Sequence, residues 1–482
     1  MPNPEQNYDL IISGAGFAGL SAAIIASKKL DRVLLIDRNP SKDVGKKTTW
    51  GWVCGDAIGK PHIDFLEKKI GVKFGSPEIE RDFHAVYALS PDLKNRFKFD
   101  GDGYALDRPE FEARLLKIAL SAGIKYLDNF EIDGPILEEN HVSGIYGRDN
   151  NNQVMVFRSK VVIDALGISS VLRRKLPQNP FIERNIESND IVLTGRYIFE
   201  YDRSDENPGF FDKSNALIHL NNNIAPGGYA WVFPKGENRV NIGLGVQKAA
   251  MEIRNRKLKV NDAVKSLLDN YVKLNSKLYN LRIYNKNNNG TGFWTVSVRR
   301  QLDSVVFNGY MGAGDSMAMP NPLSAAGIGP AIISGILSAE NAIRAIEERD
   351  VSVKGLWKYN MDYNMAYGNK MGGMELFRIY LQSLSNKSLN YGMEKFLTPE
   401  EASEITLGGT PKLSALSKLK FALRGLGDIK AFKGLVYTVQ QMKLVDDLYR
   451  NYPENPDKFG TFSTAIKSEI RHAKQMFSPL TL

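Results

Sequence analysis

A glycine motif between a predicted strand and a predicted helix constrains this chain more than any other feature. Residues 8–13 form a short apolar run of β-forming residues, and Gly14-x-Gly16-x-x-Gly19 follows directly. The helix predicted after it leads to a second apolar run, residues 32–37. Strand, glycine turn, helix and strand within about thirty residues are typical of a βαβ unit that binds a dinucleotide. The glycines permit the tight turn and let a pyrophosphate approach the helix N-terminus. A glycine-rich turn in an ordinary α/β domain is the plainer alternative.

Two further features indicate which dinucleotide is bound. Asp37 ends the second predicted strand, and a carboxylate there accepts hydrogen bonds from an unphosphorylated ribose, which favours FAD or NAD. A later predicted strand, residues 305–315, stops at Gly314-Asp315, and the segment 320–329 leads into another helix. A carboxylate beside a helix N-terminus can hold a ribityl chain and direct the helix dipole at a flavin ring. The sequence therefore predicts one bound FAD, with any nicotinamide a transient visitor.

Composition argues against several other kinds of site. Cys54 is the single cysteine among 482 residues, so no intramolecular disulfide or cysteine metal cluster can form, and the five histidines are scattered. We predict no metal. The formal net charge is +9, and residues 351–482 hold 18 basic against 12 acidic residues, without the dense basic stripe of a nucleic-acid binder. No secretory signal and no long apolar run are visible, so we expect a cytoplasmic protein, with peripheral contact at the inner face of the membrane left open.

Changes of pattern along the chain predict an α/β (α+β) fold in three parts. A discontinuous Rossmann-like FAD-binding domain takes residues 1–60, 101–175 and 295–350. Alternating apolar and polar residues, with many Asn and Gly turns, predict an antiparallel-sheet substrate domain over 61–100 and 176–294. Residues 351–482 have a helical and basic pattern, and we predict a helical C-terminal domain there.

Several segments resemble a known group of flavoproteins. Residues 14–19, Asp164-Ala165-Leu166-Gly167 and Gly314-Asp315 are similar to the three fingerprints of flavoproteins folded like p-hydroxybenzoate hydroxylase. Within that group the chain resembles the geranylgeranyl reductase family, especially archaeal-type digeranylgeranylglycerophospholipid reductases. The segments that carry this closer resemblance are 54–57 (CGDA), 229–234 (YAWVFP), 240–245 (VNIGLG) and Arg299-Arg300. It covers essentially the whole chain. The aromatic run 48–52 and the segment 321–327, less glycine-rich than in many members, depart from the pattern.

The resemblance also implies which residues contact FAD. Together with the glycines of the first turn, the predicted cofactor-binding residues are Gly14, Gly16, Ala18, Gly19, Asp37, Cys54, Gly55, Ala57, Arg108, Ile132, Asp315, Gly327 and Ile328. Arg108 has a direct reason as well, because a guanidinium at a helix start can pair with pyrophosphate. Arg114 on the same predicted helix is its rival, and a solvated helix charge explains Arg114 at least as well.

Tyr229, Trp231 and Phe233 alternate along one predicted strand, so their rings share one face. From the residues alone, the core face of a hairpin is the plainer interpretation. The resemblance instead places this face over the flavin, as a substrate-binding wall for an apolar chain. An isolated trisubstituted alkene gains cationic character on its branched carbon when it is reduced. Aromatic faces stabilise such charge by roughly 0.5–2 kcal/mol each.

Cys54 has two interpretations. The resemblance places it beside the isoalloxazine, where its thiol can act as the catalytic proton donor. A lone cysteine is more often an inert small hydrophobic residue, so packing against the flavin competes with that role.

A basic segment near the C-terminus also has two interpretations. Residues 411–433 carry six Lys or Arg and one Asp, with leucines at helical spacing, as in helices that lie on anionic membranes. Gly425 and Gly427 weaken that helix, and a surface helix packed on the protein core is the alternative.

These features together predict an FAD-dependent oxidoreductase acting on CH–CH groups. It would saturate geranylgeranyl C=C bonds of lipids in membrane lipid biosynthesis, with hydride from reduced flavin and a separate proton. The expected substrate is a prenylated lipid or prenyl diphosphate, and NADPH or ferredoxin would supply electrons transiently. The first alternative is a flavin-dependent monooxygenase or halogenase on the same fold. The second is a flavoprotein lipid carrier without catalysis.

Overall fold

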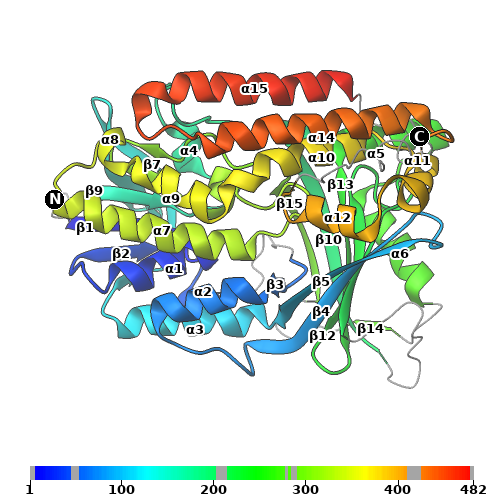
Figure 1. The fold of residues 1–482 in the computed structure, drawn as a ribbon. Helices are drawn as coiled ribbons and strands as arrows, with labels where there is room; N and C mark the ends of the chain where they lie inside the picture. Colours follow the sequence, from blue (N-terminus) through cyan, green and yellow to red (C-terminus); the bar gives the residue numbers. More distant parts are fainter. Residues whose placement is uncertain are drawn as a thin grey trace.

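The computed structural model describes residues 6–44, 54–201, 214–276, 281–283, 290–409 and 425–477, and Figure 1 shows two sheets with helices packed around them. The first sheet has the order β16-β17-β9-β1-β2-β6, and β7 and β8 join it through β9. Its strands are β1 (Gln6–Ser13), β2 (Val33–Ile36), β6 (Lys125–Leu127), β7 (Phe130–Glu138), β8 (His141–Asp149), β9 (Val154–Asp164), β16 (Val306–Phe307) and β17 (Tyr310–Gly312).

The predicted βαβ unit is present at the start of this sheet. Strand β1 pairs in parallel with β2 on one side and with β9 on the other. Helix α1 (Phe17–Ala26) connects β1 to β2 and is buried along its whole length. It crosses α7 (Ile328–Glu347) at close range, because a Cβ added to Gly335 would lie 2.1 Å from the Ala18 carbonyl oxygen. Helix α3 (Arg108–Ser121) then precedes β6, which extends the parallel sheet beside β2.

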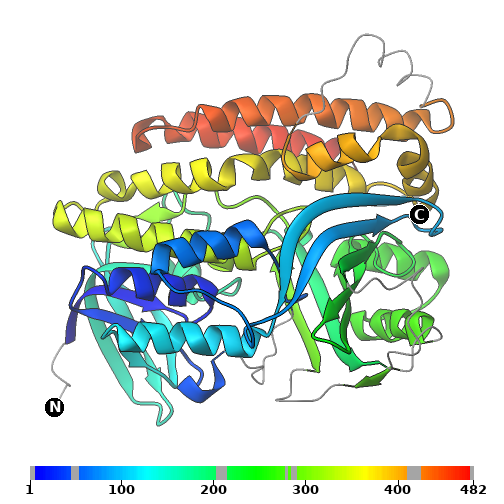
Figure 2. The same cartoon turned by 60° about the horizontal axis from the view of Figure 1, so that its bottom comes forward.

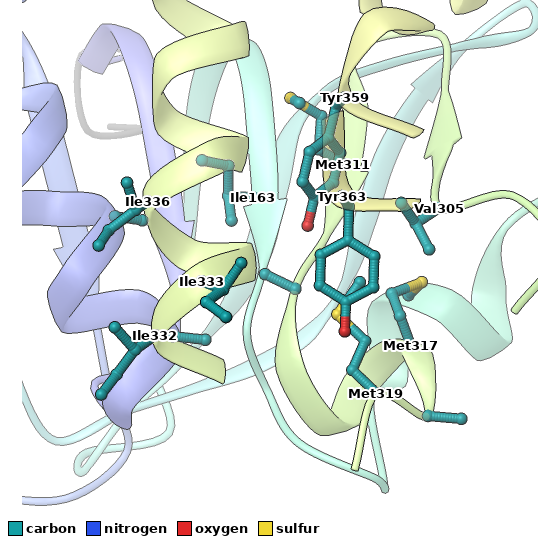
Figure 3. Packing of buried hydrophobic residues seen from close by; sticks show 14 of the residues in the cluster. Ile163, Val305, Met311, Met317, Met319, Ile332, Ile333, Ile336, Tyr359 and Tyr363 are labelled. Atoms are coloured by element: carbon teal, nitrogen blue, oxygen red, sulfur yellow. The ribbon is translucent and has the colours of Figure 1, made fainter. Parts of the chain in front are cut away.

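Helix α7 also joins the first sheet to the C-terminal region. Figure 3 shows Ile333 of α7 on the side of that helix that faces Tyr359 and Tyr363 of α9 (Lys358–Ala366), while Ile332 and Ile336 lie on its other side. All five belong to one buried cluster. The Tyr359 hydroxyl donates to the carbonyl of Gly312, the last residue of β17, at 2.9 Å. The first C-terminal helices therefore help to hold the end of strand β17.

The second sheet carries the aromatic strand. Its order is β14-β10-β13-β12-β11-β4-β5-β3, with β15 also paired to β10. The pairing is antiparallel, as predicted, except that β11 runs parallel to β4. Figure 2 shows the long β4–β5 hairpin as a curved ribbon reaching from the α2–α3 side toward the C-terminal helices. Its strands are β3 (Ala57–Gly59), β4 (Ile79–Leu89), β5 (Arg96–Leu106), β10 (Ile191–Glu200), β11 (Asn215–His219), β12 (Tyr229–Lys235), β13 (Arg239–Gln247), β14 (Arg282–Ile283) and β15 (Thr291–Ser297).

Three details differ from the sequence-based description. The strand predicted over 305–315 is a short hairpin, β16 and β17, because Gly309 turns the chain with a φ of +69°. Helices α5 (Lys248–Leu258) and α6 (Val264–Ser276) interrupt the stretch predicted as sheet. Helix α2 (Lys60–Ile70), inside the range assigned to the sheet domain, packs on α1 and α7 of the first sheet. The domain boundaries stay a prediction.

The C-terminal region is helical, as predicted. Helices α10, α14 and α15 lie roughly side by side along one side of the molecule in Figures 1 and 2. Its α-helices in the described residues are α8 (Val353–Leu356), α9, α10 (Met371–Gln382), α11 (Asn386–Tyr391), α12 (Pro399–Thr406), α14 (Ile429–Arg450) and α15 (Phe459–Met476). Among the described residues, no helix is long and apolar enough to cross a bilayer.

Two sequence-based predictions fall on segments outside the described residues. Most of the basic segment 411–433 does so, and its described remainder is a turn followed by the start of α14. Asp428 caps that helix by accepting a hydrogen bond from the Ala431 N–H at 3.1 Å. The aromatic run 48–52 lies outside the described residues entirely.

A buried cluster of ion pairs holds the two segments of chain that pass between the sheets, one just before β10 and one between β15 and β16. Arg300, between β15 and β16, pairs with Asp303 at 2.6 Å and with Glu375 of α10 at 3.0 Å. Arg378 of α10 pairs with Asp190, just before β10, at 3.0 Å. Every one of these side chains is at most 6% exposed. Helix α10 thus fixes both crossings.

Candidate active site

The turn between β1 and α1 has the geometry of a phosphate cradle. Gly14 has a φ of +102°, and a Cβ on Gly19 would lie 1.8 Å from the Gly14 carbonyl oxygen, so both positions require glycine. Over Gly16, in contrast, a Cβ would meet nothing within 4 Å. Gly16 begins α1 without a side-chain cap, and first-turn N–H groups lack partners within a helix. Open space therefore adjoins unpaired N–H groups, which suits an anion.

Asp37 lies at the end of β2, beside this turn. One carboxylate oxygen accepts the Ala15 N–H at 2.7 Å, and the other accepts the Asn39 N–H at 2.7 Å. Burial raises the pKa of Asp37, while these two hydrogen bonds oppose the rise. Asp37 therefore holds the glycine turn itself, and each oxygen keeps a lone pair that a ribose hydroxyl can use.

Asp315 lies where β17, α1 and α7 converge. A Cβ on Gly314 would lie 3.2 Å from the Ala18 Cβ, and the Gly314 N–H donates to the Ser334 hydroxyl of α7 at 3.0 Å. A Cβ on Gly327, the residue before α7, would lie 3.5 Å from an Asp315 carboxylate oxygen. Burial raises the pKa of Asp315, and the Arg108 guanidinium opposes that rise. The structure thus brings Asp315, Gly327 and Ile328 together with the N-terminus of α1.

The two candidate arginines of α3 lie in different surroundings. Arg108 donates to Glu112 at 2.7 Å, and its guanidinium carbon lies 5.2 Å from the centre of the Phe17 ring. Burial opposes the charge of Arg108, but the negative groups around it, Glu112 foremost, together raise its pKa above the ordinary value. The Arg108 guanidinium therefore stays charged beside the cradle. Arg114 pairs instead with Glu78 at 2.8 Å and with the Lys73 carbonyl at 3.0 Å. The structure therefore favours Arg108 as the pyrophosphate candidate.

The remaining predicted cofactor residues lie on two strands. Ile132 is 8% exposed on β7, whose first residue, Phe130, donates its N–H to the Asp37 carbonyl at 3.1 Å. Ala57 begins β3 of the second sheet, where it pairs with Ala105. The segment 54–57 thus enters the second sheet at β3.

Tyr229, Trp231 and Phe233 share one face of β12, as predicted. Their successive ring centres are 6.2 and 6.0 Å apart. The Trp231 ring covers Gly243 of β13, because a Cβ added to Gly243 would lie 2.1 Å from that ring. The Phe233 ring covers Gly55 in the same way, since a Cβ added to Gly55 would lie 2.7 Å from it. The Tyr229 hydroxyl donates to the Ser324 carbonyl in the segment before α7. The aromatic face therefore touches both segments that flank the expected flavin site.

Cys54 is partly exposed beside this face. Burial, with a further contribution from the Asp56 carboxylate, raises the pKa of the Cys54 thiol to about 11, while Arg108 and Arg196 oppose the rise. The Asp56 N–H donates a weak hydrogen bond to the Cys54 sulfur, with 3.2 Å between nitrogen and sulfur. The thiol is consequently protonated at neutral pH.

Four buried polar residues complete the site, and the sequence analysis assigned none of them a role. Asp56, Arg196, Lys235 and Asn241 are each at most 4% exposed. Lys235 pairs with Asp56 at 3.2 Å and with Glu80 at 3.0 Å. Burial acts to raise the pKa of Asp56, but the charges of Lys235 and then Arg196 lower it below its ordinary value. A signal existed: Arg196, Lys235 and Asn241 are polar residues within strands whose neighbours are mostly apolar.

Comparisons with known sequences identify relatives along the whole chain. Residues 197–284 match the model of the geranylgeranyl reductase catalytic domain. A digeranylgeranylglycerophospholipid reductase of Sulfolobus acidocaldarius is 32% identical over 98% of this chain and 100% of its own length. The corresponding enzyme of Thermoplasma volcanium is 29% identical over 73% of this chain and 82% of its own.

Solved structures show the same fold. A geranylgeranyl bacteriochlorophyll reductase-like protein from Thermoplasma acidophilum has a TM-score of 0.71 at 24% identity, covering 90% of this chain and all of its own. A flavin-dependent brominase has a TM-score of 0.60 at 18% identity, covering 88% of this chain and all of its own. Likenesses at this level of identity establish the fold and leave the reaction open.

Proposed function

The chain belongs to the geranylgeranyl reductase family, and on that premise we propose that it is an FAD-dependent reductase that saturates isoprenoid C=C bonds of a lipid. The observation that carries the proposal is the aromatic face of β12. It meets Gly55 through Phe233 and Ser324 through Tyr229, so an apolar wall borders the expected flavin site. A monooxygenase or halogenase has no comparable support beyond the shared fold.

The residues present fit FAD. Open space over Gly16 adjoins the N-terminus of α1, while the carboxylates of Asp37 and Asp315 lie at two strand ends. We propose that Gly14, Gly16 and Gly19 receive the pyrophosphate with Arg108, that Asp37 receives the adenosine ribose, and that Asp315 receives the ribityl chain. Bound FAD supplies the hydride once an electron donor has reduced it. The donor, NADPH or ferredoxin, is left open by these residues.

The aromatic face would act on the substrate in two ways. It removes water from the prenyl chain, and burying each CH₂ contributes about 0.8 kcal/mol. Its rings also face the branched carbon that gains cationic character, which they stabilise by roughly 0.5–2 kcal/mol each. A wall of this kind selects chain length and methyl branching rather than a polar head group.

Cys54 would hold the proton at its sulfur. With its pKa raised to about 11 by burial, the thiol keeps this proton through the neutral range. Such a thiol is a weak acid, so it would give its proton to the less branched alkene carbon as hydride reaches the branched carbon, which leaves the saturated chain and a thiolate. The competing role, packing against the flavin, needs the same position.

The experiment compares two substrates for the purified, FAD-loaded protein with chemically supplied electrons. A geranylgeranyl lipid should be saturated without oxygen, and its mass should rise by two hydrogens per reduced bond. A small hydroxylated aromatic should remain unchanged both anaerobically and in air. Hydroxylation or halogenation of the aromatic in air, with the lipid untouched, would establish the monooxygenase or halogenase alternative. Stoichiometric lipid binding without turnover would establish the carrier.

The location of the protein also stays a proposal. Its lipid substrate and the basic C-terminal region lead us to propose peripheral contact with the inner face of a membrane. Co-sedimentation with vesicles containing anionic lipid, lost when the salt concentration is raised, would support that contact.

A further inference from the structure

Asn241 joins the aromatic strand to the cysteine segment through its side-chain amide. The residue lies on β13 and is fully buried. Its Oδ1 accepts a hydrogen bond from the Trp231 indole N–H at 2.9 Å. Its Nδ2 donates to the Cys54 carbonyl oxygen at 2.9 Å and lies 3.4 Å from a carboxylate oxygen of Asp56. Both ends of one amide are thus committed to the two elements that flank the substrate.

The position of the Cys54 thiol depends on this short segment of main chain. Asp56 has a φ of +58°, a left-handed conformation that a non-glycine residue holds only when its surroundings fix it. Lys235 holds the Asp56 carboxylate from one side at 3.2 Å. Asn241 holds the Cys54 carbonyl from the other. Removing the amide would free one of these two attachments.

We propose that Asn241 is a positioning residue, which keeps the Cys54 thiol and the Trp231 ring in a fixed relative position across the substrate site. The catalytic meaning of this arrangement rests on the proposed reductase function. The amide offers an acceptor to the indole and, at its other end, a donor to the carbonyl. Asn241→Asp would set a second carboxylate against Asp56, and Asn241→Leu would leave the buried indole N–H and the Cys54 carbonyl without this partner.

The test uses the fact that Cys54 is the single cysteine, so iodoacetamide labels one site in the FAD-loaded protein. Alkylation rates are compared for wild type, Asn241→Leu, Trp231→Phe and the double variant. Trp231→Phe keeps a ring and removes only the indole N–H. We expect alkylation to be about tenfold faster in Asn241→Leu and about threefold faster in Trp231→Phe, the range expected from losing one or two buried hydrogen bonds. The double variant should match Asn241→Leu alone.

Asn360→Leu is the matched control. Asn360 is 2% exposed on α9, and its amide likewise joins two partners, the Val305 N–H at 2.9 Å and the Ser304 hydroxyl at 3.0 Å. Its loss should destabilise the protein without changing Cys54 alkylation. An equal acceleration in Asn360→Leu would overturn the proposal, and so would effects of Trp231→Phe and Asn241→Leu that multiply in the double variant. If Asn241→Leu does not fold, an unchanged rate in Trp231→Phe alone overturns it and an accelerated rate supports it.

Turnover gives a second readout that a purely structural role would not produce. Asn241→Leu should lower kcat for a geranylgeranyl lipid about tenfold, while KM and the rate of flavin reduction stay near wild type. A matching fall in flavin content would contradict the proposal. Coupled alkylation rates in a protein that reduces no lipid would leave the positioning intact and refute the reductase function, so the two failures are distinguishable.

Discussion

The two sheets position their functional groups by different means. At the first sheet the main chain itself makes the site, because Gly14 and Gly19 lie too close to neighbouring carbonyls to carry a side chain. At the second sheet large side chains make it: Trp231 covers Gly243, Phe233 covers Gly55, and buried polar groups hold them. A backbone cradle should fail completely when it is blocked. A wall of rings should lose function by degrees, so the same kind of substitution should have different consequences in the two sheets.

The largest expected effect is on flavin content, and it tests the cradle. Gly16→Val should fold, because its Cβ meets no protein atom within 4 Å, yet it should purify colourless, since valine fills the space for pyrophosphate. Absorbance near 450 nm and the melting temperature report the two properties separately. Gly101→Val on β5, with equally open surroundings, is the control and should stay yellow. A Gly16→Val variant that still binds flavin would contradict the view that the backbone of the first sheet forms the pyrophosphate site.

The next effect concerns the junction between the two sheets. Arg300→Leu should lower the free energy of unfolding by about 3–5 kcal/mol, because it removes the nearest cation from the buried carboxylates of Asp303 and Glu375. Each carboxylate keeps only a more distant partner, Lys467 at 3.8 Å and Arg378 at 3.5 Å respectively. Denaturant titration measures it. Arg450→Leu, whose side chain is 72% exposed beside Asp447, should change the stability by less than about 1 kcal/mol. Equal losses of unfolding free energy in the two variants would mean that the buried ion pairs stabilise the junction no more than an exposed ion pair does.

A graded effect is expected in the second sheet. Trp231→Ala should keep FAD and its reduction, but lower turnover of a geranylgeranyl lipid about tenfold to a hundredfold, because the ring and its electrostatic face are both lost. Phe293→Ala on β15 of the same sheet, whose ring contacts Tyr197 on the opposite face, should keep its turnover. Loss of flavin from Trp231→Ala would show that the two sheets do not act separately.

The smallest effect concerns Cys54. Cys54→Ser should keep FAD and slow alkene reduction about threefold to tenfold, since a hydroxyl is a weaker acid than a thiol. Burial raises the thiol pKa to about 11, above its value in an unfolded chain. The protonated thiol therefore contributes stability that is complete below about pH 9 and is lost as the pH rises through 11. Alkaline unfolding of wild type and Cys54→Ser should differ only in that window, and wild-type turnover at pH 8.5 in the serine variant would assign the thiol to packing.

The sequence determined the parts of this protein that depend on local pattern. The glycine spacing between two apolar runs predicted the βαβ unit, and the structure confirms it with β1 and β2 in parallel. Strict alternation placed Tyr229, Trp231 and Phe233 on one face, because successive residues of a strand point to opposite sides. The family fingerprints extended this to a cofactor and a reaction. The roles of the predicted site residues stay proposals.

Only the tertiary structure decided which distant groups meet. Arg108 and Arg114 lie on one predicted helix, and the sequence does not show that Glu78 engages Arg114 from 36 residues away. That contact supports the proposal for Arg108. Asn241 and Cys54 are 187 residues apart, yet one hydrogen bond of 2.9 Å joins them. Periodicity reports which side of an element is buried, whereas the partner of a buried polar group is set by how separate elements pack, and a sequence alone does not contain that distance.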